Sequence, residues 1–112
     1  MYRVLLVDDE YMITEGLKVL IPFEKWNMQV VATANDAETA LAYIKDNPVD
    51  LVITDVNMPG MNGLQMIEQM KASLPNAAFI ILSGYQEFEY VKTALNLQVA
   101  DYLVKPVDKV EL

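Results

Sequence analysis

Short strand-like runs alternate with helical segments along the whole chain, and this alternation restricts the fold more than any other feature. Four runs are almost wholly apolar, as strands covered on both faces are. They span residues 4–7, 51–54, 79–82 and 102–104. A fifth run, residues 28–33, is more alternating, which is typical of an edge strand in a mostly parallel sheet. The sequence therefore predicts five strands.

Between the strands, apolar residues recur at the spacing of one helix face. The stripes are Ile13, Leu17, Leu20 and Ile21; Ala37, Ala40, Leu41 and Ile44; Leu64, Ile67 and Met70; and Phe88, Val91, Ala94 and Leu95. For the second stripe we expect Asn35 to be the N-cap, with Glu38 as its capping-box partner and Asn47-Pro48 at the end. We expect a last helix to start at residue 107 and to be cut short at residue 112.

This order of elements predicts an α/β fold with a doubly wound parallel sheet and right-handed crossovers. We expect five strands in the order 2-1-3-4-5, so that the first and third strands are neighbours where the order reverses. Residues 1–112 then form one domain with an incomplete final helix, as the front part of a longer protein.

Composition excludes several kinds of function. The chain has 16 acidic and 8 basic residues and a formal charge of −8, which argues against a nucleic-acid or anionic-membrane surface. The chain has no cysteine and no histidine. It therefore cannot form a disulfide, a metal site with thiolate or imidazole ligands, or a Ser-His triad. No apolar run approaches the roughly 20 residues that span a bilayer, and no signal peptide is evident, so we expect a cytoplasmic domain.

Polar residues stand at the carboxyl ends of four predicted strands. They are Asp8, Asp9 and Glu10 after the first strand, Asp55 after the third, Ser83 after the fourth and Lys105 after the fifth. In a doubly wound sheet, ligands bind beyond these strand ends at the point where the strand order reverses. We therefore expect the acids to share one pocket, with the hydroxyl and the ammonium on its rim.

Clustered carboxylates repel one another unless a cation lies among them. Because only a few oxygen ligands are present, the expected ion is Mg²⁺, which keeps several waters and accepts one or two carboxylates plus phosphate oxygens. A cation, a lysine and a hydroxyl around one carboxylate are suited to holding a phosphoryl group for in-line attack. Asp55 is the predicted nucleophile, which would form an acyl phosphate.

Four motifs, in order along nearly the whole chain, resemble the receiver domain of bacterial two-component response regulators. They are LLVDDE at 5–10, DVNMPGMNG at 55–63, LSG at 82–84 and DYLVKP at 101–106. The resemblance implies a flavodoxin-like fold in which Asp55 takes a phosphoryl group from a sensor histidine kinase. It also implies a signalling switch that is not an enzyme, apart from catalysing its own Mg²⁺-dependent phosphorylation and dephosphorylation.

The same resemblance implies a metal-ligand set. Asp9 and Asp55 would bind Mg²⁺ directly, together with the backbone carbonyl of Asn57. Asp8 would act through a bound water.

The resemblance further implies how phosphorylation is transmitted. Lys105 would pair with the phosphoryl group, Ser83 would move towards it, and Tyr102 would turn inward, which remodels the face of the fourth helix, fifth strand and fifth helix. The run at 82–90 resembles receivers fused to AraC-type helix-turn-helix output domains, so transcription would be controlled by a DNA-binding domain outside this chain. A homodimer of the phosphorylated protein is compatible with this scheme.

Simpler interpretations of the same residues stay open. The acids at 8–10 could only cap the first helix. Pro59-Gly60 and Asn62-Gly63 could be turn residues alone, and Tyr102 could be a core aromatic.

The same residues suggest two other functions, each of which would require a different sequence feature. A Mg²⁺-dependent phosphohydrolase with an aspartyl-phosphate intermediate would want a second acid two residues after Asp55, where Asn57 stands. An interaction module that never turns over phosphate would be expected to lack one of the acids or the lysine, and all are present.

Overall fold

The computed structural model describes residues 1–56, 58–83 and 101–104. In chain order the elements are β1 (Tyr2–Val7), α1 (Tyr11–Leu20), the short 3-10 helix η1 (Phe23–Trp26), β2 (Met28–Ala34), α2 (Ala37–Asp46), β3 (Leu51–Asp55), α3 (Gly63–Ser73), β4 (Ala78–Ser83) and β5 (Asp101–Val104). The predicted strands at 4–7, 28–33, 51–54 and 79–82 are confirmed, as are the first three helices. The helices expected from the Phe88 stripe and at 107–112 lie outside the described residues.

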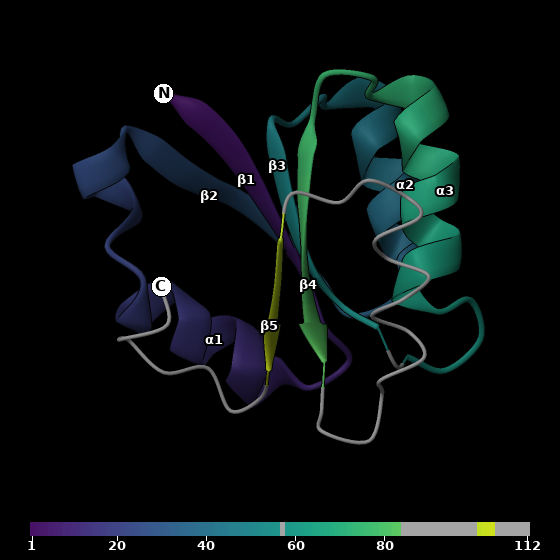
Figure 1. Cartoon of the computed structure of the whole chain (residues 1–112), viewed down its shortest axis with the longest axis horizontal. Coiled ribbons are helices and arrows are strands. Elements are labelled where there is room, and N and C mark those ends of the chain that lie inside the picture. Colours follow the sequence, from purple (N-terminus) through teal and green to yellow (C-terminus); the bar gives the residue numbers. More distant parts are fainter. Residues whose placement is uncertain (57, 84–100, 105–112) are drawn as a thin grey trace.

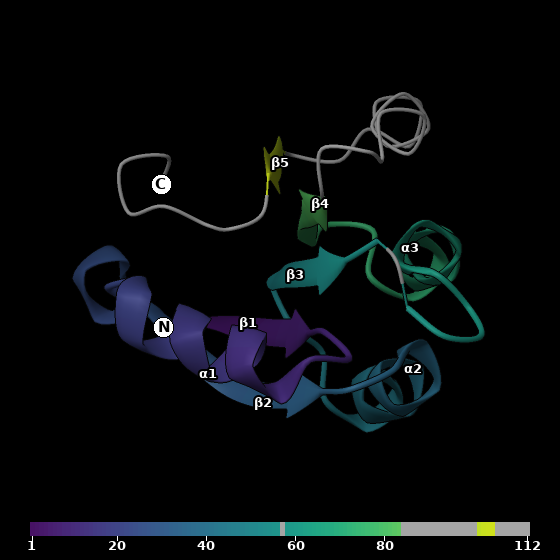
Figure 2. The same cartoon turned by 90° about the horizontal axis from the view of Figure 1, so that it is seen from below.

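The strands form a parallel sheet in which β1 and β3 are the central neighbours (Figure 2). The order β2-β1-β3-β4 agrees with the prediction, and the short β5 pairs with the outer side of β4. The edge strand β2 is irregular, because Val4 pairs with Val30 whereas Leu5 pairs with Ala32. Val31 is therefore an extra residue in β2, and such a bulge makes an edge strand a poor template for another chain.

Helices cover both faces of the sheet, with α1 on one side and α2 and α3 on the other (Figure 1). This explains why β1 and β3 are apolar without alternation: Leu5 and Val7 pack towards α2 and α3, whereas Val4 and Leu6 pack towards α1. The two cores fix the sheet between the helix layers, and the strand ends are held in place with it.

The predicted N-cap of α2 is wrong by one residue. Asp36, not Asn35, is the N-cap, and its Oδ1 accepts a hydrogen bond from the main-chain N–H of Thr39 at 2.7 Å. Three residues after this cap stands Thr39, so Glu38 cannot be the capping-box partner. The helix ends as predicted at Asn47, whose side-chain amide donates to the carbonyl oxygen of Tyr43 at 3.1 Å.

The start of α3 shows that Asn62-Gly63 is more than a turn. The side chain of Asn62 accepts from the main-chain N–H of Gln65 at 2.9 Å, and the Gln65 side chain accepts from the main-chain N–H of Asn62 at 3.0 Å. This reciprocal capping box fixes where α3 begins. Gly60 does hold the positive φ of a turn, at 77°.

Over the three described stretches of the chain, every helix is too short or too polar to cross a membrane.

Candidate functional site

The register of the sheet brings the predicted site residues to one edge. Val7 pairs with Thr54, so the residues that follow them, Asp8 and Asp55, stand at neighbouring strand ends. Asp55 in turn pairs with Leu82, which precedes Ser83. The ends of β1, β3 and β4 therefore lie side by side, as predicted from their order.

Two further predicted site residues, Tyr102 and Lys105, belong to β5 or directly follow it in the sequence. Ser83 pairs with Val104, the residue before Lys105, and Tyr102 pairs with Ile81. Lys105 itself and Asn57 lie outside the described residues. Their predicted roles beside the phosphoryl group and the metal stay predictions.

The acids after β1 form a compact cluster. Asp8, Asp9 and Glu10 each offer a carboxylate oxygen, and these oxygens all lie within 4.8 Å of one another. Asp8 is buried, with 1% of its surface exposed, whereas Asp9 and Glu10 are exposed. Oδ1 of Asp8 accepts a hydrogen bond from the main-chain N–H of Glu10 at 2.9 Å, which fixes the turn that groups the three acids.

This cluster fits a hard divalent cation. Carboxylate oxygens are the ligands that Mg²⁺ prefers, and a cation among like charges offsets their repulsion. Asp8 is buried and Asp9 is exposed to solvent. A cation bound to the Asp9 carboxylate could therefore take water molecules as its remaining ligands.

The start of α1 bears on the alternative role of these acids as helix caps. The N-cap of α1 is Glu10, its side chain makes no capping hydrogen bond, and the first turn contains no acidic residue. Side-chain capping by Glu10 is therefore contradicted, whereas an interaction of the acids with the N-terminal helix dipole stays a hypothesis.

Asp55 is the last residue of β3 and is 4% exposed. Its main chain is held from two sides: the hydroxyl of Thr54 donates to the Asp55 carbonyl oxygen at 2.9 Å, and the N–H of Val56 donates to the Leu82 carbonyl oxygen at 3.2 Å. The strand end that carries the predicted nucleophile is thus rigidly placed. Thr54 has no sequence signal for this contact, since threonine is common in strands.

A cavity of about 290 Å³ opens beside the acidic cluster. Asp8 and Asp9 line it together with hydroxyl and amide side chains from α1, α2 and the end of β2, including Thr14, Thr33 and Asn35. The acidic cluster is therefore accessible from the side of β2, through a cavity whose lining combines acidic, hydroxyl and amide groups with apolar ones.

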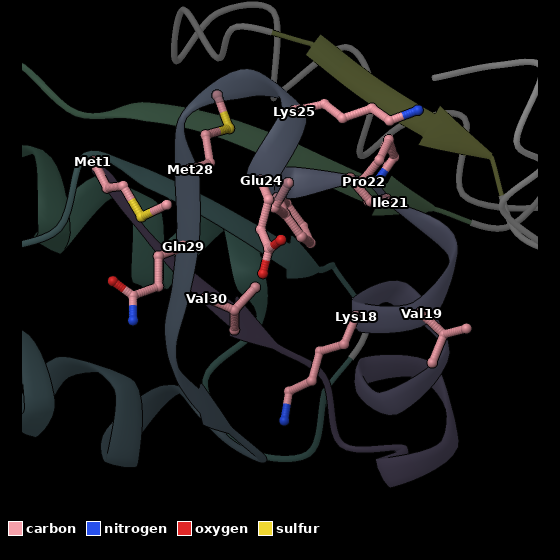
Figure 3. A pocket seen from close by; sticks show the side chains of 11 residues that line it. Met1, Lys18, Val19, Ile21, Pro22, Glu24, Lys25, Met28, Gln29 and Val30 are labelled. Carbon is pink, nitrogen blue, oxygen red and sulfur yellow. The ribbon is translucent and has the colours of Figure 1, made fainter.

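A larger cavity, of about 650 Å³, lies far from these acids around the connection from α1 to β2 (Figure 3). Its charged lining residues are Lys18, Glu24 and Lys25, and Lys18 pairs with Glu15 at 3.0 Å. Size alone would favour this cavity, but it has no cluster of acids or hydroxyls. The chemistry points to the strand ends.

Comparison with known proteins agrees with this geometry. Residues 4–112 match the family model described as the response regulator receiver domain. The chain belongs to the response regulator receiver domain family. Receiver domains are phosphoacceptor modules of two-component systems and act as signalling domains rather than as enzymes on other substrates.

Relatives of this receiver domain are response regulators. It is 42% identical, over its whole length, to an uncharacterized response regulatory protein of Staphylococcus epidermidis, and 41% identical to the transcriptional regulatory protein HptR of Staphylococcus aureus. In both cases the match covers 44% of the relative. The chain therefore spans less than half the length of these relatives.

Solved structures show the same fold. The REC domain of AraT, a response regulator from Geobacillus stearothermophilus, is 42% identical with a TM-score of 0.92, over 98% of this chain and 85% of that one. A two component transcriptional regulator AraC from Clostridium phytofermentans is 31% identical with a TM-score of 0.91, over 99% and 86% of the two chains. The flavodoxin-like parallel sheet expected from the motifs is confirmed.

Proposed function

We propose that this receiver domain accepts a phosphoryl group on Asp55, with Mg²⁺ held by Asp9, Asp55 and the backbone carbonyl of Asn57, and with Asp8 acting through a bound water. The observation that supports this best is the pairing of strand ends, which sets buried Asp55 beside the acidic cluster at 8–10. The metal would neutralise the oxygens of the phosphoryl group.

The transfer needs the phosphohistidine of the kinase, the Asp55 carboxylate, the proposed Mg²⁺ and water. A carboxylate oxygen of Asp55 attacks the phosphorus of a phosphohistidine on the sensor kinase. The O–P bond forms as the N–P bond breaks, and the electron pair stays on the imidazole nitrogen, which takes a proton from water. Lys105 would hold the phosphoryl oxygens. The domain would thereby catalyse its own phosphorylation, and with water as nucleophile its dephosphorylation.

The rest of the protein follows from the same family. We infer a sheet of five strands in the order 2-1-3-4-5 and a single domain at 1–112. Relatives named as transcriptional regulators, and solved neighbours named AraT and AraC, support an AraC-type DNA-binding output domain in the intact protein. Sensor-kinase partnership, a cytoplasmic location and a homodimer of the phosphorylated form are parts of this proposal.

Phosphorylation of the chain by a small phosphodonor with Mg²⁺, followed by intact-mass measurement and peptide mapping, tests the function. We expect one phosphoryl group on Asp55 and none in Asp55→Asn. Phosphorylation of another residue, or no phosphorylation of the unmodified protein, would contradict the proposal and leave an interaction module. Many turnovers of a phosphomonoester per protein would instead favour a phosphohydrolase.

A further inference from the structure

The first residue of α3 is packed against the main chain of Asp55. A Cβ atom built on Gly63 would overlap the carbonyl oxygen of Asp55, and it would lie 3.0 Å from the Asp55 carbonyl carbon and 3.1 Å from Cα of Val56. These neighbours are main-chain atoms at the end of the buried strand β3, so they cannot move as a flexible side chain can. Only glycine lets α3 approach this closely.

The main chain of Asp55 and Val56 also makes hydrogen bonds with several neighbouring parts of the structure. The N–H of Gly63 donates to the carbonyl oxygen of Val56 at 2.9 Å, while the N–H of Val56 donates to Leu82 in β4. The Thr54 hydroxyl donates to the carbonyl oxygen of Asp55, the atom that the extra Cβ would strike. The peptide group between Asp55 and Val56 is thus held in place by contacts with α3, β4 and Thr54.

The position of Gly63 is set by α3, and α3 is anchored independently. Its capping box fixes the first turn, and Leu64, Met66 and Ile67 are buried against the sheet. A larger residue at position 63 could be accommodated only by moving the helix start or the end of β3. Because both the helix start and the end of β3 are held by core contacts and hydrogen bonds, a shift of either one would change how the Asp55 main chain is placed.

We propose that Gly63 and Thr54 are positioning residues for the phosphoryl site. Both act on the main chain of Asp55, and neither is proposed to touch the metal or the phosphoryl group. Their contacts set the direction in which the strand end presents its carboxylate to the acids at 8–10. This inference rests on the proposed function, since it assigns to both residues a role in the same site.

The test is Mg²⁺ affinity, measured by calorimetry at a temperature where circular dichroism shows each variant fully folded. Gly63→Ala should weaken Mg²⁺ binding roughly 10-fold or more, the range seen when groups that orient metal ligands are lost. Phosphorylation by the small donor should slow in parallel. Gly16→Ala is the matched control, because nothing lies within 4 Å of a Cβ at that exposed helix position, and its Mg²⁺ affinity should be unchanged.

Thr54 provides a second variant that keeps the core volume. Thr54→Val removes the hydroxyl and should weaken Mg²⁺ binding, whereas Thr54→Ser keeps the hydroxyl and should restore the affinity of the unmodified protein. This rescue separates the hydrogen bond from packing. It also keeps the inference testable if Gly63→Ala does not fold.

A purely structural role would give a different result. Leu17→Ala removes core volume under α1, away from Asp55, and should lower thermal stability with unchanged Mg²⁺ affinity. If Thr54→Val and a folded Gly63→Ala behave like Leu17→Ala, losing stability but binding Mg²⁺ normally, the positioning role is refuted. That outcome differs from failure of the proposed function, in which the unmodified protein itself would not be phosphorylated on Asp55.

Discussion

The carboxylate of Asp36 binds the first turn of α2 through Thr39, whose main-chain N–H lies 2.7 Å from Oδ1. Hydrogen bonds from the Thr39 side chain and, second, from its main-chain N–H lower the pKa of Asp36 below its usual value of 3.8. An Asp whose pKa is lowered by folding stabilises the fold when it is ionised. An ionised N-cap therefore stabilises α2, the helix that borders the cavity beside the acidic cluster.

The first prediction concerns this cap. Asp36→Ala should lower the free energy of unfolding at pH 7, because it leaves an N–H of the first turn without its acceptor. The folded-state pKa lies below the unfolded one, so the contribution is fully present above about pH 4 and is lost as the pH falls through the lowered pKa. Urea denaturation of both proteins from pH 7 to pH 3 should show the difference shrinking.

Asn35→Ala is the control for that measurement. Asn35 precedes the cap, so its loss should change stability less than the loss of Asp36 does. A larger effect at Asn35 would mean that the helix start is wrongly placed.

The second prediction concerns the metal ligands. Asp9→Ala should weaken Mg²⁺ binding strongly, because it removes a proposed direct ligand. Asp8→Ala should weaken it less, by about 10-fold, as expected for a group that acts through water. Equal losses in calorimetric titrations, or tight binding retained by Asp9→Ala, would reverse the proposed inner and outer ligands.

The third prediction separates phosphorylation from the response. Ser83→Ala should still be phosphorylated on Asp55, because the hydroxyl is not the nucleophile, but it should lose the proposed inward movement of Tyr102. A contact made only with the phosphoryl group present is what shifts a two-state equilibrium. The measurement is the NMR signal of the Tyr102 ring with and without beryllofluoride.

Lys105→Ala completes that comparison, since it should impair the response while leaving some phosphorylation. A full shift of the Tyr102 signal in Ser83→Ala would show that this hydroxyl does not couple the two residues.

The fourth prediction compares two glycines at which an added Cβ atom would have no neighbouring atom within 4 Å. Gly16 lies within α1, so Gly16→Ala should raise the free energy of unfolding by roughly 0.5–1 kcal/mol. Gly60 has a φ of 77°, so Gly60→Ala should lower it by about 1 kcal/mol. Urea denaturation measures both, and equal signs would contradict the role of φ.

The order of the elements, and the edge of the sheet where the strands that precede the acids end, can be derived from the amino-acid sequence alone. Strands buried on both faces need uninterrupted apolar runs, as in β1 and β3, and helices need stripes, as in α2. Parallel strands carry their carboxyl ends to one edge whatever their detailed packing. This is why Asp8 and Asp55 could be assigned to one site from the order of the strands alone.

The contacts and the burial of each residue at that edge depend on the tertiary structure. Asn35 and Asp36 are both good caps locally, and the path of the chain from β2 selects Asp36. Likewise, neighbouring Asp8 and Asp9 differ in burial, and the start of α3 brings Gly63 back against Asp55, eight positions earlier in the chain. Such contacts depend on three-dimensional distance, which local sequence patterns do not encode.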